Sequence, residues 1–288
     1  GYFFLYIGLM AILFDKNTRF GDLKKKLDKV KAKKAKLATV ITLFISLGAF
    51  AQEGHIHERM SQKQIDSLLD KYKVSEEHAA KFGRLVIQDN GRMKPANTFA
   101  SELLRKVSKS DTYNGMNAEQ VLLSMALMDR IWYNVPILHL QRGNDSIRTV
   151  LGLPKNAKYA ALADFVDPKT QSYKLTGILA EANREKVPNK FQQDFLDIDK
   201  RLTLLNWAIS GEVFRVIPVP GDKGNRWVNY REANEESIKG LDTIKNIIPF
   251  YLQSLGQAVT TGDYKLSDSI LEGLNKMQHK YGKDVMPS

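Results

Sequence analysis

From residue 61 onward, apolar side chains recur every three or four positions over most of the chain, which is the spacing of one buried helix face. In SQKQIDSLLDKY, for example, Ile65, Leu68 and Leu69 share a face behind a Ser61 N-cap. By the same pattern, we predict helices over residues 61–72, 75–82, 117–128, 189–211, 237–262 and 265–282. The region is therefore expected to be mainly α, with N-caps at Ser75 and Asn117 as well.

Between these helices, the stretch FGRLVIQDNGRMKPANTFASELLRK (82–106) predicts a short hairpin that leads into a helix. An Asp-Asn-Gly turn at 89–91 follows the apolar run 85–87, and Asn and Gly tolerate the positive φ that tight hairpins need. Asn97 or Thr98 is expected to cap the helix that follows.

A second hairpin is predicted from GEVFRVIPVP (211–220) and RWVNY (226–230), which flank a polar loop. Trp227 and Tyr230 are either core residues or exposed contact residues of this hairpin. Pro249 is expected to kink the helix predicted over 237–262.

The first 51 residues have a different pattern, because two uncharged apolar runs, 2–14 and 37–51, flank the lysine-rich stretch 15–36. A membrane-spanning helix needs about 20 apolar residues, so 2–14 is expected to be the remainder of a longer span. Lysine stems that reach the headgroups extend 37–51 into a short transmembrane segment. Alternatively, 37–51 is a signal peptide with cleavage after Ala51.

The charge distribution orients these segments. The 288-residue chain has a net charge of +11, and residues 15–36 hold ten Lys/Arg against three Asp/Glu. Short loops rich in Lys and Arg stay cytoplasmic, so 15–36 is expected to face the cytoplasm and contact the lipid membrane. Residues 52–288 then form one α-rich periplasmic domain on a bacterial inner-membrane anchor. Because most of the excess charge lies outside that domain, no nucleic-acid partner is expected.

Residue types that carry chemistry are few. The absence of cysteine excludes disulfides and thiolate zinc sites, and no catalytic motif or metal site is recognisable. In His-Ile-His, the side chains of His55 and His57 point the same way if the segment is extended, so they are candidates for binding haem or a metal. The alternative is a solvated stretch without a ligand. His78, on a polar helix face, His139 and His279 are interpreted as surface or satisfied core histidines.

Three basic residues, Arg84, Arg92 and Lys94, flank the turn at 89–91. They are candidates for contact with an anion or a partner. In the alternative interpretation, the stretch is only a hairpin followed by a capped helix, because those roles account for nearly every other residue in it.

Several stretches together resemble the fused System II cytochrome c biogenesis proteins of Bacteroidetes, which join a ResB-like half to a CcsA-like half. The stretches that carry the resemblance are 1–25, 82–107, 114–127, 151–167 and 279–288. It extends through most of the chain and rests on similar sequence rather than on chemical motifs. It implies that this chain is the ResB-like half. The start at Gly1 and the ending at Ser288, which lacks a terminus signal, lead us to expect a longer protein.

Members of that family are membrane haem exporters and cytochrome c synthases, which attach haem to apocytochrome c. The resemblance therefore implies haem as cofactor of the complete protein, with apocytochrome c and the CcsA-like half as partners. The family's tryptophan-rich motif is absent, and 2–14 and 37–51 contain no histidine, so no haem ligand is assigned here. Residues 52–288 are expected to be a non-catalytic periplasmic platform. The alternatives are a membrane-anchored envelope binding or scaffold protein without cofactor and, less favoured, an envelope hydrolase.

Overall fold

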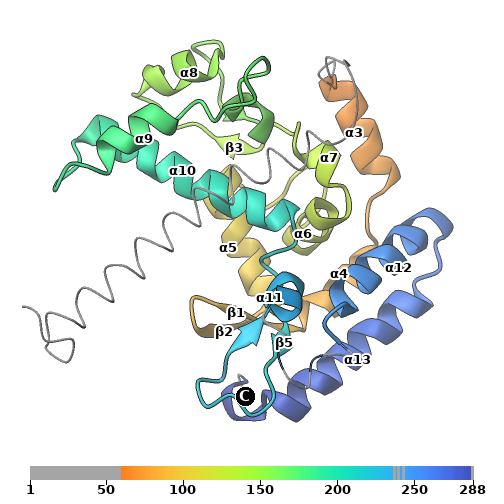
Figure 1. Cartoon of the computed structure of the whole chain (residues 1–288). Helices are drawn as coiled ribbons and strands as arrows, with labels where there is room; N and C mark the ends of the chain where they lie inside the picture. The colour runs from red at the N-terminus through yellow and green to blue at the C-terminus, as the bar shows by residue number, and fades with distance from the viewer. Residues whose placement is uncertain (1–59, 236–237, 239–240, 242–243, 287–288) are drawn as a thin grey trace, which may run out of the picture. The chain divides into compact units, whose positions relative to one another are not determined.

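The computed structural model describes residues 60–286 except 236–237, 239–240 and 242–243 (Figure 1). The predicted membrane segments 2–14 and 37–51, the basic stretch 15–36, and His55 and His57 lie outside the described residues. The chain divides into two units, 1–57 with 168–173 and 58–167 with 174–288. Of the first unit, residues 168–173 are described; they form a turn in which the hydroxyls of Thr170 and Ser172 are 2.7 Å apart.

The second unit is mainly helical. Its α-helices are α3 (Gln62–Lys71), α4 (Glu76–Gly83), α5 (Ala96–Ser108), α6 (Ala118–Leu127), α7 (Asp129–Trp132), α8 (Asp145–Leu151), α9 (Thr176–Ala182), α10 (Lys190–Ile209), α11 (Tyr230–Glu235), α12 (Ile247–Thr261) and α13 (Lys265–Tyr281). Its 3-10 helices are η1 (Leu162–Phe165) and η2 (Lys283–Val285). Three antiparallel strand pairs complete it: β1 (Val86–Asp89) with β2 (Arg92–Pro95), β3 (Leu138–His139) with β4 (Tyr159–Ala160), and β5 (Ile217–Pro218) with β6 (Trp227–Val228).

The predicted fold class needs a correction. Its mainly helical character with short hairpins agrees with the structure, but the structure provides no membrane-spanning helix: among the described residues, none is both long and apolar enough to cross a membrane. The longest, α10, has 20 residues, but Lys, Arg and Asp side chains alternate with the apolar ones along its sequence. Such a helix buries one stripe against a protein core and leaves its polar face in water.

Local capping signals set the starts of three helices. The Ser61 hydroxyl accepts from the Gln64 backbone, and the Gln64 side chain accepts from the Ser61 N–H, which completes a capping box. The same arrangement starts α6 at Asn117 and α10 at Asn189. The predicted caps at Ser61, Ser75 and Asn117 are therefore confirmed.

The hairpin of β1 and β2 is confirmed as well. Asn90 and Gly91 have φ values of 50° and 80°, which a two-residue primed turn requires. The predicted caps at Asn97 or Thr98 are wrong, since α5 begins at Ala96 and has no side-chain cap. The Ala96 N–H donates to the Leu85 carbonyl at 2.8 Å, so the hairpin backbone satisfies this helix start.

The third strand pair confirms the predicted hairpin at 211–230, and it places Trp227 in the core with 2% of its surface exposed. The predicted kink at Pro249 is wrong, because Pro249 is the third residue of α12 and precedes any intrahelical N–H bond that it would break. Helix α12 starts at Ile247, ten residues after the predicted start at 237.

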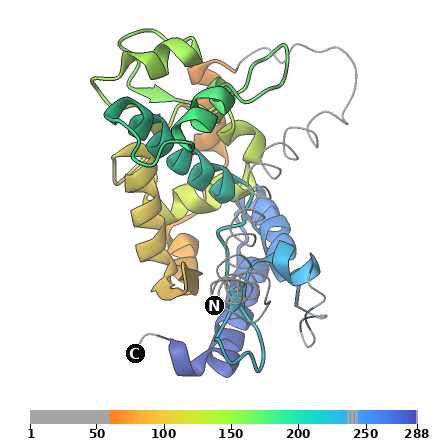
Figure 2. The same cartoon turned by 60° about the vertical axis from the view of Figure 1, so that its left-hand side comes forward.

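Two groups of helices form the core of this unit. Helices α5, α6 and α10 pack on one another, and α12 lies antiparallel beside α13, which contacts α4 (Figures 1 and 2). Gln278 of α13 is fully buried and connects β1 with the residue before β5. Its side-chain oxygen accepts from the Val86 N–H at 3.0 Å, and its side-chain nitrogen donates to the carbonyls of Val86 and Val216, each at 2.9 Å. A polar side chain thus pairs with the β1 backbone at Val86, and two residues later the Gln88 N–H donates to the Arg215 carbonyl at 3.1 Å.

Candidate functional site

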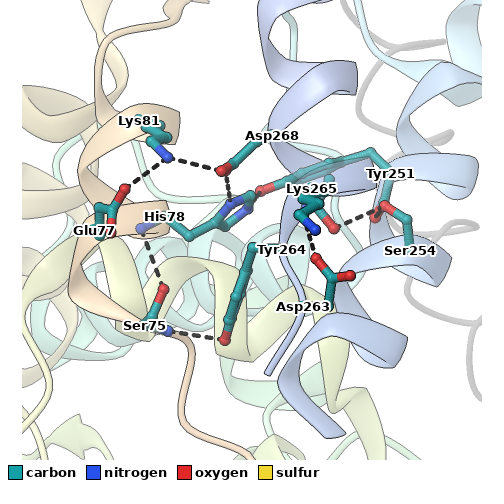
Figure 3. Close-up of polar contacts among 11 residues, drawn as sticks. Ser75, Glu77, His78, Lys81, Tyr251, Ser254, Asp263, Tyr264, Lys265 and Asp268 are labelled. Atoms are coloured by element: carbon teal, nitrogen blue, oxygen red, sulfur yellow. Dashed lines mark hydrogen bonds and ion pairs between the residues drawn. The ribbon is translucent and has the colours of Figure 1, made fainter. Parts of the chain in front are cut away.

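A polar cluster lies where α4 meets α12 and α13 (Figure 3). Its centre is His78, which is 1% exposed. The imidazole Nδ1 lies 2.7 Å from Asp268 Oδ1, and Nε2 lies 2.8 Å from the Tyr251 hydroxyl. We call these residues, with Lys81 and Tyr264, the His78 cluster.

The start of α4 positions the histidine. The Ser75 hydroxyl accepts from the His78 N–H as the N-cap, and the Ser75 N–H donates to the Tyr264 hydroxyl at 3.1 Å. Lys81 follows three residues after His78 and therefore lies on the same helix face. Its ammonium group donates to Asp268 Oδ2 at 2.7 Å. The Asp268 carboxylate therefore binds both His78 and Lys81 of α4.

The surroundings determine the protonation of the cluster. Burial lowers the pKa of His78 below its ordinary value, and the hydrogen bond with Asp268 offsets this only in part. Burial acts to raise the pKa of Asp268, but the hydrogen bonds from Lys81 and His78 outweigh it and lower that pKa. Burial also raises the pKa of Tyr251 well above its ordinary value. A neutral imidazole that donates from Nδ1–H to Asp268 and accepts at Nε2 from Tyr251 satisfies all three groups.

A carboxylate, an imidazole and a hydroxyl in a row have the composition of a proton relay, but burial decides what this one does. Tyr251 is 1% exposed, as is His78, and the tyrosine rings at 251 and 264 lie 5.8 and 5.0 Å from the imidazole centroid. A substrate cannot reach the reactive atoms in this arrangement. The cluster joins three helices and makes their packing depend on the protonation of His78.

His78 is thus a satisfied core histidine, one of the two alternatives predicted for it, and only its placement on a polar helix face is wrong. Its partners come from α12 and α13, 173 and 190 residues later, so no local pattern reveals them. The one local indication is the Ser75 cap, which fixes the register of α4 and places His78 and Lys81 on one face.

The structure places the three basic candidates of the first hairpin differently. Lys94 lies between two carboxylates, 2.7 Å from Glu102 and 2.9 Å from Asp89, and these hydrogen bonds raise its pKa. Arg84 is exposed at the end of α4, and Arg92 is exposed on β2, where it lines a shallow cavity of about 570 Å³. Contact of these residues with an anion or partner stays a prediction.

The other histidines differ from each other. His279 is exposed, with Nδ1 2.9 Å from the Asn275 carbonyl oxygen. His139 is half-buried, and its Nδ1 is the one buried side-chain polar atom without a hydrogen-bond partner in the described part of the chain. Within residues 60–286, apart from the gaps, no three His, Asp or Glu side chains are grouped as a metal ion requires.

Comparison with known proteins gives one relevant similarity. The chain is 28% identical to protein NrfI of Wolinella succinogenes over 298 aligned positions, which cover all of this chain and 30% of that protein. The chain thus spans about a third of the length of this relative. No family model matches the chain. The similarity supports the cytochrome c biogenesis resemblance at that general level; it does not show a ResB-like half or a fusion.

Proposed function

We propose that this chain belongs to a cytochrome c biogenesis protein and takes part in attaching haem to apocytochrome c. The observation that carries the proposal is the similarity to NrfI, which extends over the whole chain rather than over one motif. A local match would fit a shared structural element, whereas a match of this extent fits a shared role for the entire region.

Within such a protein, we assign residues 60–286 the role of a ResB-like platform that holds apocytochrome c near the parts that handle haem. Two features support a platform. The buried His78 cluster and Gln278 connect helices and strands through hydrogen bonds, which favours one fixed arrangement of the domain. The chain also matches only 30% of NrfI, so the proposal leaves haem chemistry to a CcsA-like part elsewhere in the protein.

The experiment replaces the native gene with one that lacks the codons for residues 60–286. We expect c-type cytochromes to lose covalently attached haem, measured by haem staining of denaturing gels, while cellular b-type haem spectra stay normal. Because a large deletion can also remove the whole protein, an epitope tag must show that the shortened protein accumulates. Normal haem attachment at normal protein level would refute the proposal and favour an envelope scaffold without cofactor.

The platform role makes a narrower claim, which a second measurement tests. Purified full-length protein is mixed with apocytochrome c and, separately, with the mature cytochrome. A platform binds the apoprotein whether or not haem is present. Binding that requires haem would argue against this assignment and leave the broader role in haem attachment standing.

We also propose that this domain lies in the periplasm. Alkaline phosphatase is active only outside the cytoplasm, so its fusion after residue 286 should give active enzyme in cells. An inactive but stable fusion would contradict this location.

A further inference from the structure

A basic face lies at the pair of strands β3 and β4, away from the His78 cluster. We define it by His139, Tyr159, Lys109, Arg142 and Arg201, which come from β3, β4, the end of α5, the loop after β3, and α10. His139 and Tyr159 are directly opposite in the strand register, and their rings meet edge to face at 5.7 Å. Tyr159 is 40% exposed, so this ring pair is open to solvent on one side.

Two positive charges of the basic face are not neutralised by ion pairs within the described chain. Lys109 and Arg142 are exposed, and neither pairs with a carboxylate of the described residues. Burial, then Arg201, Lys109, Arg148 and Arg142 in that order, lower the pKa of His139, so cations surround this imidazole. Its buried Nδ1 also has no partner within the described part. Arg148 has the Asp145 carboxylate at 3.6 Å and Arg201 has Asp197 nearby, so the charges without a counter-charge among the described residues are those of Lys109 and Arg142. Two exposed, unpaired cations beside this imidazole favour an anionic partner.

Two buried or half-buried arginines hold this face in shape. Arg201 donates to the His139 carbonyl at 2.8 Å and so fixes β3 on α10. Arg148, which is 4% exposed, donates to the carbonyls of Gln141 and Ala157 at 3.0 and 2.9 Å. Arg148 therefore anchors the backbone just before Arg142 and the segment that leads into β4, so this part of the basic face is preorganised.

We propose that the basic face binds an Asp- and Glu-rich segment of a protein partner. Its exposed cations, Lys109 and Arg142, come from two separate elements and lie on an open surface, whereas a small anion is held by donors that converge on one point. The exposed Tyr159 beside arginines matches the residue types enriched in protein–protein interfaces. A lipid surface would instead favour lysines along an amphipathic helix. This surface goes beyond the role in haem attachment and does not depend on it.

The test uses the full 288-residue chain and a fluorescein-labelled decaglutamate peptide, with fluorescence anisotropy as the readout. The variant K109Q/R142Q removes two charges from the basic face. The control K63Q/K276Q removes two exposed lysine charges from α3 and α13, far from it in the sequence. We expect about a tenfold loss of affinity for the first variant and less than about twofold for the control. Thermal unfolding by circular dichroism checks that both variants remain folded.

Further arms distinguish the source of the anion. A decaglutamine peptide, inorganic phosphate, and vesicles of phosphatidylglycerol with phosphatidylcholine replace the labelled peptide in turn. Binding of decaglutamate alone supports the proposal, whereas preference for phosphate or vesicles, or equal losses in both double variants, overturns it. A direct readout is the pKa of His139 by NMR, which must rise when decaglutamate binds, because a nearby anion favours the imidazolium. If K109Q/R142Q unfolds, the single variant R142E takes its place.

Discussion

Replacing His78 with leucine tests the assignment of the His78 cluster as a structural connection between helices. The change removes both imidazole nitrogens but keeps an apolar side chain of similar size in the cavity. The Tyr251 hydroxyl, which is fully buried, then has no acceptor, and an unsatisfied buried group costs about 1–3 kcal/mol. Asp268 keeps its bond to Lys81 and its carboxylate is partly exposed, so the lost imidazole bond adds only about 1 kcal/mol.

The expected loss in the free energy of unfolding is therefore about 2–4 kcal/mol, a large share of the stability of a typical domain. Urea unfolding of the full chain, followed by circular dichroism, measures it as a lower midpoint with an unchanged slope. His279→Leu is the matched control, because that histidine is exposed on α13 and a surface change has an effect within about 0.5 kcal/mol.

A double-mutant cycle with Tyr251→Phe separates the hydrogen bond from the loss of packing. Tyr251→Phe removes the hydroxyl and leaves Nε2 of His78 unpaired. If the two residues act through their bond, the double variant is destabilised by clearly less than the sum of the single variants. A His78→Leu effect no larger than that of the control, or strictly additive effects in the cycle, would refute the structural role.

Three further predictions concern the His78 cluster and helix α13. As the pH falls from 7.5 to 5.5, the wild type should lose more free energy of unfolding than His78→Leu, measured by urea unfolding. Burial lowers the pKa of His78 in the folded state, so the unfolded chain binds the proton first. Stability is therefore lost as the pH falls below about 6.5, the ordinary pKa of histidine. Gly282→Ala should cost about 1–3 kcal/mol by the same assay, because a Cβ there would clash with the Trp227 ring. Gly273→Ala, with nothing within 4 Å of its Cβ, should instead stabilise α13 by about 0.5–1 kcal/mol. Gln278→Leu should cost at least about 2 kcal/mol and accelerate hydrogen exchange at the Val86 amide, its present partner.

Features set by neighbouring residues could be predicted from the sequence, and features set by distant contacts could not. The caps at Ser61 and Asn117 and the turn at Asn90 and Gly91 depend on a few adjacent residues, so their patterns are visible along the chain. The partners of His78 lie more than 170 residues away, so its polar local surroundings could not decide between a surface and a satisfied core histidine. The membrane anchor was predicted from residues 1–51, and no described helix provides one.

The same long-range dependence explains the error at the start of α5. A sequence pattern shows which side chains are able to cap a helix, such as Asn97 and Thr98, but it does not show whether a cap is needed. Here the Leu85 carbonyl from the hairpin already accepts the Ala96 N–H, so the helix begins before either residue. Backbone pairing between elements thus replaced a local capping signal.

Residues that stabilise the fold and residues proposed for recognition lie on different elements. Helix α13 supplies Asp268, which binds α4, and Gln278, which binds β1. Gly282, directly after the helix, lies close to Trp227. Changes in and just after α13 therefore alter the stability of the domain. The basic face belongs instead to α5, β3, β4 and α10 and exposes its charges. A defect in haem attachment caused by α13 variants should therefore follow protein level and be relieved at lower temperature. The loss of decaglutamate binding expected for K109Q/R142Q should instead come with an unchanged unfolding midpoint, because both side chains are exposed and form no ion pair among the described residues.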